Sequence, residues 1–207
     1  MSTPPTAAKA DGAVIPLLRD KAARDAADRA YARVVEQARH PRFFTDCGVP
    51  DTLDGRFELI CLHAFLYLHR LKDARPRAEV LGQRFFDTMF DDMDRSLREM
   101  GTGDLGVGRQ VKRMAQAFYG RIQAYENGIE KEDALLTPAL ARNLFGTVSE
   151  SEPFLDAMAT YVRDEVVRLR HQPISALLAG DVAFGPPPIG QRRPVSPAAS
   201  ALLKGGA

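Results

Sequence analysis

The stretch FELICLHAFLYLHRL, residues 57–71, decides how this chain folds. Eleven of its fifteen residues are apolar, and they fall on nearly every face of a helix. A helix that is apolar all round is normally the buried central helix of a domain. Because a membrane span needs about 20 apolar residues, this stretch is too short to cross a bilayer. We therefore place it in the middle of a helical bundle.

Patterns typical of helices lie on both sides of this stretch. Apolar residues recur at helical spacing, without the period-two alternation of strands, over about residues 18–39, 76–100, 107–125, 137–146 and 151–172. The sequence therefore predicts an all-α, single-domain bundle of about six helices over residues 18–180. Both ends are rich in Pro, Gly, Ala, Ser and Thr, so we expect residues 1–17 and 181–207 to be disordered.

The composition excludes several classes of protein. The net charge is +1, which gives no bulk electrostatic footprint for nucleic acid, so we expect no DNA partner. Cys47 and Cys61 have no motif spacing, and we interpret them as buried, reduced thiols. The first residues show neither a secretory signal nor an Arg-rich transit peptide, which favours a bacterial cytoplasmic protein. No catalytic triad, nucleotide loop or metal motif is recognisable, so we expect no enzyme activity.

Several motifs follow one another in the first half of the chain. They are VPDTLDGRFEL at 49–59, Leu62-His63, Gln83, FDTMFDDMD at 86–94 and LREMGTGDL at 97–105. In this order they resemble the ubiquinol–cytochrome c chaperone family, over about residues 31–145. Members of that family assist assembly of the respiratory ubiquinol–cytochrome c reductase by attending to its newly made cytochrome b.

The resemblance implies a function and a set of partners. It implies a non-enzymatic assembly chaperone, without a cofactor, that binds nascent or apo cytochrome b and promotes assembly of the reductase. Mitochondrial members work with a second assembly factor and near the ribosome, and the sequence leaves open whether a bacterial member keeps either contact. It also leaves open whether a cytoplasmic member touches the inner membrane peripherally.

The resemblance also marks residues for a candidate binding or structural motif, namely Asp51, Arg56, Glu58, His63, Arg98, Glu99 and Asp104. If the second and third helices are antiparallel neighbours, the start of one and the end of the other share one side of the bundle. We therefore expect the six charged residues to form one polar neighbourhood. Removing one partner of a buried pair there, for example by Arg56→Ala, would cost about 3–5 kcal/mol. The Gly101 and Gly103 pair indicates a helix stop rather than a phosphate loop, because no strand precedes it.

Two further surfaces are open to two interpretations each. The apolar residues of the third helix exceed what one buried stripe needs, and they are Phe85, Phe86, Met89, Phe90 and Met93. A wide core face is favoured, and an exposed client surface at Phe86, Met89 and Phe90 is the alternative. Arg109, Lys112 and Arg113 form a basic face of the fourth helix. That face is either simply solvated or a contact for anionic lipid or ribosomal RNA.

A rival class is a metal- or ligand-binding helical protein with a carboxylate and histidine centre on the second and third helices. Its candidate residues are His63 with Asp87, Asp91 and Asp94, which are spaced i, i+4, i+7 on one helix face. The chain lacks the Glu-x-x-His pairs of helical di-metal sites. We favour a solvated acidic stripe with local Asp–Arg pairs and a hydrogen-bonded core histidine, and we expect no bound metal.

Overall fold

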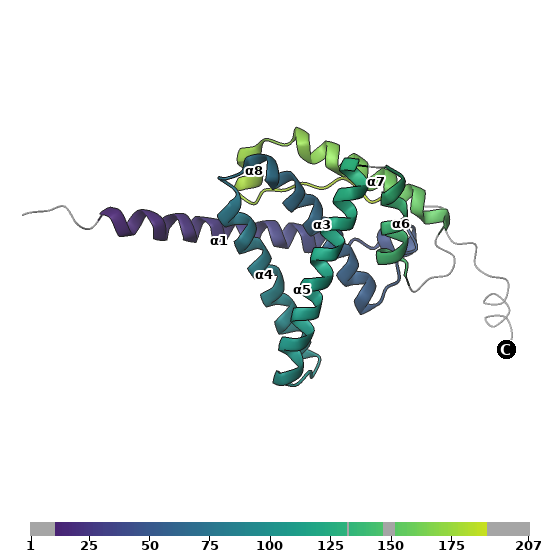
Figure 1. Cartoon of the computed structure of the whole chain (residues 1–207), viewed down its shortest axis with the longest axis horizontal. Coiled ribbons are helices and arrows are strands. Elements are labelled where there is room, and N and C mark those ends of the chain that lie inside the picture. Colours follow the sequence, from purple (N-terminus) through teal and green to yellow (C-terminus); the bar gives the residue numbers. More distant parts are fainter. Residues whose placement is uncertain (1–10, 132, 147–151, 190–207) are drawn as a thin grey trace, which may run out of the picture.

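The structure, a computed structural model, describes residues 11–131, 133–146 and 152–189. These residues form α1 (Asp11–Ala38), α2 (Arg42–Thr45), α3 (Leu53–Leu71), α4 (Glu79–Glu99), α5 (Asp104–Glu126), α6 (Asp133–Leu144), α7 (Glu152–His171) and α8 (Ile174–Leu178) (Figure 1). A 3₁₀ turn at Lys72–Ala74 follows α3, and a π-helical turn at Asn127–Lys131 joins α5 to α6. No strand occurs in the described ranges, and the predicted all-α fold is confirmed.

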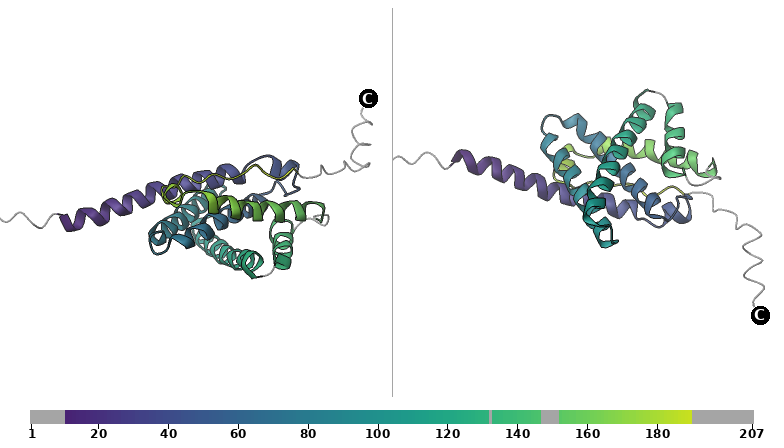
Figure 2. Two further views of the ribbon diagram at one scale, coloured as in Figure 1. Left: turned by 90° about the horizontal axis from the view of Figure 1, so that it is seen from above. Right: turned by 60° about the horizontal axis from the view of Figure 1, so that its bottom comes forward.

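The six long helices correspond to those expected from the sequence, with differences at their ends. α1 begins at Asp11 rather than near residue 18, and both views of Figure 2 show its N-terminal part projecting beyond the other helices. The helix expected at 137–146 begins at Asp133, so Pro138 lies inside α6 instead of opening it. The short helices α2 and α8 were not predicted from the sequence; each anchors itself through one buried residue, Phe43 and Leu177 respectively.

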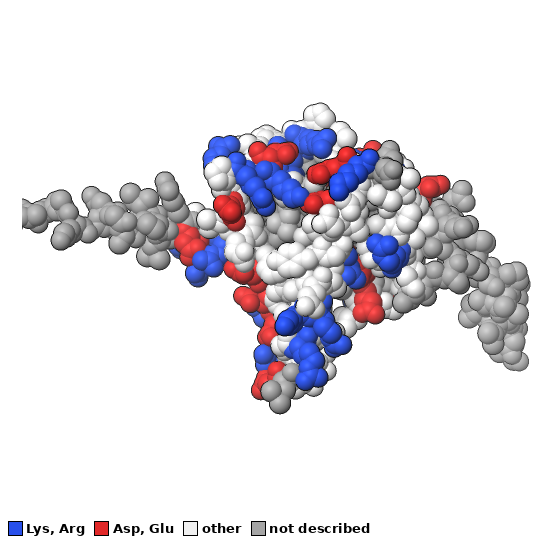
Figure 3. Space-filling model, in the orientation of Figure 1, with Lys and Arg blue, Asp and Glu red and all other residues white. Residues whose placement is uncertain are grey.

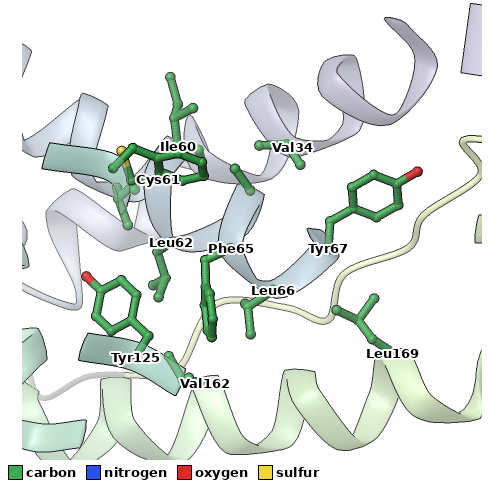
Figure 4. Close-up of a cluster of buried hydrophobic side chains, with 14 of the residues drawn as sticks. Val34, Ile60, Cys61, Leu62, Phe65, Leu66, Tyr67, Tyr125, Val162 and Leu169 are labelled. Atoms are coloured by element: carbon green, nitrogen blue, oxygen red, sulfur yellow. The ribbon is translucent and has the colours of Figure 1, made fainter. Parts of the chain in front are cut away.

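α3 is the central helix, as its composition predicts. All side chains from Glu58 to Tyr67 are buried, and the helix packs against α1, α5, α6 and α7. Figure 4 shows Phe65 and Leu66 pointing toward α7, whose Val162 and Leu169 face them. Burying apolar surface releases about 25 cal/mol per Å², so this one helix supplies a large part of the stability of the fold.

The geometry at the start of α3 explains why Thr52 and Gly55 occur in the motif at residues 49–59. The side chain of Thr52 accepts a hydrogen bond from the Gly55 amide at 3.1 Å and so caps the helix. The Pro50 carbonyl oxygen lies so near Gly55 that a Cβ there would sit 2.0 Å from it. Any larger residue at position 55 would therefore push the incoming chain off the helix.

α4 and α5 form an antiparallel pair that reaches the lower tip of the molecule in Figure 1. α4 ends at Glu99, and Gly101 adopts a φ of +86°, a left-handed conformation that favours glycine. α5 begins at Asp104. The Gly101-Thr102-Gly103 stretch is thus a helix stop and a restart, as the sequence indicated.

After α8, residues 181–189 form an extended segment that runs between α1 and α7 (Figure 1). Side chains hold its backbone: Gln37 donates to the Gly185 carbonyl at 2.8 Å, and Gln172 exchanges two hydrogen bonds with Ala183 at 2.6 and 3.0 Å. The Gly185 amide donates to the buried Glu165 carboxylate at 3.0 Å. The sequence placed these residues in a disordered tail, whereas the structure packs them on the domain. The rest of that tail, 190–207, and residues 1–10 lie outside the described residues.

Candidate functional site

An open cavity of about 600 Å³ lies where the start of α3 faces the second half of α4, the middle of α5 and the end of α6. Much of its lining is apolar: Leu53, Phe57, Ile60, Met93, Leu97, Met100, Met114, Ala117 and Leu144. Leu53 and Met100 are 60% and 53% exposed. Three of the six methionines of the chain line this one cavity, and their flexible thioether side chains adapt to partners of different shape.

The charged lining of the cavity is mostly cationic. Its guanidinium groups belong to Arg39, Arg56, Arg113, Arg121 and Arg142, and its carboxylates belong to Asp54, Glu58 and Asp92. Arg121 pairs with Glu58, and Arg56 pairs at 2.7 Å with Asp51, which lies outside the lining. Asp92 accepts a hydrogen bond from the Tyr31 hydroxyl at 2.8 Å.

Three of these arginines have no carboxylate partner. Within the described parts of the chain, Arg39, Arg113 and Arg142 make no ion pair, although Arg113 donates to the side chain of Gln110. Asn143, which also lines the cavity, has a buried side-chain nitrogen next to the buried Tyr125 hydroxyl. The cavity therefore offers several hydrogen-bond donors, most of them positively charged, beside an apolar surface.

The Glu58–Arg121 pair forms one wall of the cavity and joins α3 to α5. Nε and Nη2 on one edge of the Arg121 guanidinium group donate to the two oxygens of the Glu58 carboxylate. The Glu58 side chain is 8% exposed and the Arg121 side chain 18%. Burial raises the pKa of the Glu58 carboxyl above its ordinary value, and the contact with Arg121 opposes this rise. The Arg121 guanidinium also lies over the Phe57 ring, 5.7 Å from its centroid. Such a pair holds two helices at a fixed spacing, because separating its members would leave a buried charge.

The structure brings the two predicted motifs to the same cavity but pairs their charges differently. Leu53 and Glu58 at the start of α3 and Met100 at the end of α4 share its lining, as the antiparallel arrangement predicts. Arg98, however, binds Asp94 at 2.6 Å and Asp104 at the α4–α5 turn, away from the lining. No ion pair joins Arg98 or Glu99 to Asp51 or Arg56 in the described structure, because Arg56 and Arg98 both pair with residues close to them in the chain. Glu58 instead pairs with Arg121 of α5.

Arg39, Arg121, Arg142 and Asn143 are among the site residues that sequence reasoning missed. Arg121 stands three residues after Phe118 and four before Tyr125, both of which are fully buried. An arginine next to an apolar stripe on a bundle helix needs a partner, and Glu58, a carboxylate in the most apolar stretch of the chain, needs one as well. That shared requirement is the signal that could have linked them. No comparable signal marks Asn143.

His63 is a hydrogen-bonded core residue. Its ring is fully buried; Nδ1 donates to the Leu59 carbonyl at 2.7 Å, and Nε2 accepts from the Tyr161 hydroxyl at 2.9 Å. Burial lowers the pKa of His63 to about 4, so the imidazole is neutral near pH 7. The Tyr161 hydroxyl in turn accepts from Gln37 at 2.9 Å, which links the histidine to the extended C-terminal segment.

The acidic stripe of α4 is occupied by local contacts. Asp87 accepts from Gln83 at 2.8 Å and lies 3.6 Å from Arg84, and Asp94 binds Arg98. Across the described ranges, no group of three or more His, Cys, Asp and Glu side chains is arranged to hold a metal ion. The structure thus does not bring His63 and these carboxylates together.

The candidate client surface is reduced by burial. Met89 is fully buried and Phe90 is 7% exposed, because both pack into the core. Phe86 is half-buried and stacks on the exposed ring of Tyr119, with centroids 5.5 Å apart. These two rings line a second cavity of about 410 Å³ between the end of α3, the start of α4 and α5. The wide core face favoured from the sequence therefore accounts for Met89 and Phe90, and only Phe86 reaches the surface.

The basic face of α5 is exposed. Arg109, Lys112 and Arg113 all reach solvent, and residues 105–125 contain no Asp or Glu. Figure 3 shows Lys and Arg gathered over the lower half of α5, with acidic side chains on the α4 side. In the ranges that the structure covers, every helix is too short or too polar to cross a bilayer.

Comparison with known proteins places these features in a family context. The family model described as ubiquinol-cytochrome C chaperone matches residues 45–184. The chain is 30% identical over 162 residues to ubiquinol-cytochrome-c reductase complex assembly factor 1 of Xenopus laevis, covering 78% of this chain and 81% of the frog protein. To the human assembly factor of that name it is 29% identical over 162 residues, with 78% of this chain covered but only 54% of the human protein.

A solved structure has the same fold. The crystal structure of the Cbp3 homolog from Brucella abortus has a TM-score of 0.73 and 37% sequence identity to this chain. The likeness covers 84% of this chain and 97% of the Brucella chain. Since the family match begins at residue 45 and ends at residue 184, it includes the whole of α3 and α4, the cavity lining apart from Arg39, and the first part of the extended segment.

Proposed function

We propose, since this chain belongs to the ubiquinol-cytochrome c chaperone family, that it is a non-enzymatic chaperone that binds newly made cytochrome b and promotes assembly of ubiquinol–cytochrome c reductase. Its relatives are assembly factors of that complex, and cytochrome b is the client that the sequence resemblance implies. The chaperone would act by transient shielding of apolar segments, with no covalent step.

The observation that carries the proposal is the open, methionine-rich cavity beside the two family motifs. A contiguous apolar surface on a monomeric protein is typical of an interaction site. Thioether side chains can rearrange around successive segments of different shape, which suits a client that must later be released. We therefore place the client contact at this cavity rather than at Met89 and Phe90, which are buried.

Two experiments test the proposal. Deleting the gene should lower the amount of assembled reductase while other respiratory complexes stay near normal. Affinity capture during active synthesis of the reductase should enrich cytochrome b. A deletion strain with normal reductase would contradict the assignment as a whole.

A pair of matched variants tests the placement at the cavity. Met100 lines the cavity and is 53% exposed, whereas Val167 on α7 lies outside the lining and is 52% exposed. Met100→Asp should therefore fold normally and lose cytochrome b capture, and Val167→Asp should fold normally and keep it. Equal capture by both variants would place the client elsewhere.

The same proposal includes peripheral contact with the membrane. A helix face with three cations and no acid is attracted to anionic lipid headgroups. Binding to phosphatidylglycerol vesicles should fall when Arg109 and Lys112 are changed to Gln and should fall with added salt; binding that depends on neither would contradict this contact. The second assembly factor and the ribosome stay predictions from the resemblance.

A further inference from the structure

We propose that the open cavity selects apolar peptide segments that carry an acidic side chain, and that Arg113 and Arg142 hold the carboxylate of that side chain. The inference rests on the proposed function, because the segment would belong to the membrane-protein client. It adds a chemical criterion by which the chaperone would distinguish one apolar segment from another.

The charge of the cavity is the first argument. Five guanidinium groups face three carboxylates in the lining, and the two arginines that have carboxylate partners are Arg56 and Arg121. Arg113 and Arg142 keep their charge without an ion pair to any described residue. A guanidinium group binds a carboxylate through two parallel hydrogen bonds, so each of these side chains is a ready receptor for Asp or Glu.

The surroundings of these arginines are the second argument. Met93, Met100, Met114 and Phe57 provide apolar surface in the same cavity, and an occupant would displace water from it. Electrostatic attraction is stronger where water is excluded, so a carboxylate on an apolar segment gains more here than on an open surface.

The size and the acidic lining favour a peptide over a polyanion. A cavity of about 600 Å³ holds a few side chains of one segment. Asp54 and Asp92 also line it and would repel a chain of phosphates, whereas one or two carboxylates leave the site close to neutral. Nucleic acid is therefore disfavoured, and an apolar peptide with an isolated acidic residue fits both the shape and the charge.

Direct binding measurements with the purified full chain test the inference. The probes are two synthetic amphipathic peptides with a Leu and Met face, which differ only by Glu or Gln on the flank of that face. We expect the Glu peptide to bind at least about tenfold more tightly, which corresponds to about 1.4 kcal/mol. In the double variant Arg113→Gln/Arg142→Gln the preference should fall below about twofold.

A control variant separates site recognition from bulk charge. Arg109→Gln/Lys112→Gln also removes two positive charges, but from the exterior of α5 and outside the cavity lining. This variant should keep the preference for the Glu peptide. Arg142→Lys should retain part of it, because lysine keeps the charge but not the planar fork. Equal binding of the two peptides to the unchanged protein, a preference that survives in the double variant, or a preference lost equally in the control would each overturn the inference.

Lipid is the alternative occupant, and the same assay distinguishes it. If vesicles of phosphatidylglycerol displace the peptide from the unchanged protein and the Glu preference is absent, the cavity is a lipid site and the inference fails. Displacement by phosphatidylcholine vesicles would mean that only the apolar surface matters, with the same consequence.

Failure here can be told apart from failure of the proposed function. If the peptides show no Glu preference but cytochrome b is still captured in cells, the selection rule is wrong and the chaperone assignment stands. If the peptide preference is present and depends on Arg113 and Arg142 while gene deletion leaves the reductase intact, the selection rule stands and the chaperone assignment is wrong.

Discussion

The two buried polar residues of the central helix α3, Glu58 and His63, lie in opposite surroundings. His63 lies on what we call the closed side. This side is the region where α3 faces Tyr161 and Glu165 of α7 and where the extended segment 181–189 covers the domain. Both of its ring nitrogens have partners, and the chain itself covers them. Glu58 lies on the open side, at the wall of the 600 Å³ cavity, where one arginine satisfies it and three other arginines have no carboxylate partner among the described residues.

This difference in how the two sides satisfy their polar groups indicates which side is available to a binding partner. Buried polar groups are nearly always satisfied within a folded chain, and the closed side follows that rule through side chains of α1 and α7. The open side leaves cations and apolar side chains uncovered within one small region. Among the described residues, the C-terminal segment covers the closed side, whereas the open side has a cavity. We therefore infer that the cavity is where this protein meets other molecules.

The largest expected effect tests whether the open side also has a structural part. Arg121→Met should lower the free energy of unfolding by about 3–5 kcal/mol, because it leaves the Glu58 carboxylate buried without its partner. Arg113→Gln, about two helix turns closer to the tip on α5 and also in the cavity lining, should leave the unfolding midpoint unchanged. Chemical denaturation of both variants provides the measurement. Equal stabilities would mean that the Glu58–Arg121 pair is as dispensable as a surface pair.

Acidification should weaken the closed side through His63. The pKa of His63 is about 4 in the folded protein and about 6.5 in an unfolded chain, so between these values only the unfolded state takes up the proton. Stability therefore falls as the pH falls through this window, by up to about 3 kcal/mol at 1.36 kcal/mol per pH unit. Denaturation at pH 7 and near pH 4 should show this slope, and His63→Gln should reduce it. The exposed His171 provides a control; a His171→Gln variant that flattens the slope as much as His63→Gln would refute the assignment.

A smaller effect tests whether the extended segment really closes that side. A Cβ at Gly185 would lie 2.4 Å from the Glu165 carboxylate, which is almost fully buried, so Gly185→Ala should cost about 1–3 kcal/mol. At Gly108 on α5 a Cβ meets nothing within 4 Å, so Gly108→Ala should instead stabilise the helix, by up to about 1 kcal/mol. Thermal melts of the two variants should shift in opposite directions. No shift for Gly185→Ala would mean that the segment behaves as the disordered tail that composition predicted.

These two sides were unequally predictable from the sequence. The open side is built from helices whose period and end signals are local, so the placement of α3, α4 and α5 followed from the sequence. The closed side depends on a Gly-Pro-Pro-Pro stretch at 185–188 whose composition is typical of disorder. Its order comes from hydrogen bonds to Gln37 and Glu165, which are 148 and 20 residues away in the chain. Contacts of that kind leave no periodic signal in the segment that they hold.

The candidate site was predictable in part for the same reason. The motifs around Asp51–Glu58 and Arg98–Asp104 could be recognised as a set, and antiparallel geometry brought their helix ends to one cavity. Which charges pair was not predictable, because Arg98 satisfies itself with neighbours within six residues, whereas Glu58 reaches Arg121, 63 residues away. The burial of Met89 and Phe90 likewise depends on how α4 lies between its neighbours, which a single helix pattern does not specify.

The smallest expected effect concerns Arg56. From the sequence, Arg56→Ala was expected to lower the free energy of unfolding by about 3–5 kcal/mol if Arg56 belonged to a buried pair. In the structure both members of the Arg56–Asp51 pair are more than half exposed, at 57% and 54%, and exposed ion pairs contribute little because water and salt screen them. Arg56→Ala should therefore leave the unfolding midpoint unchanged in the same assay in which Arg121→Met lowers it. Because Arg56 lines the cavity while Asp51 does not, cytochrome b capture should respond more to Arg56→Ala than to Asp51→Ala. A clear drop in stability for Arg56→Ala would mean that the motif at the start of α3 has a structural role. It would also remove the distinction between Arg121, which stabilises the open side, and the lining arginines that can bind a partner.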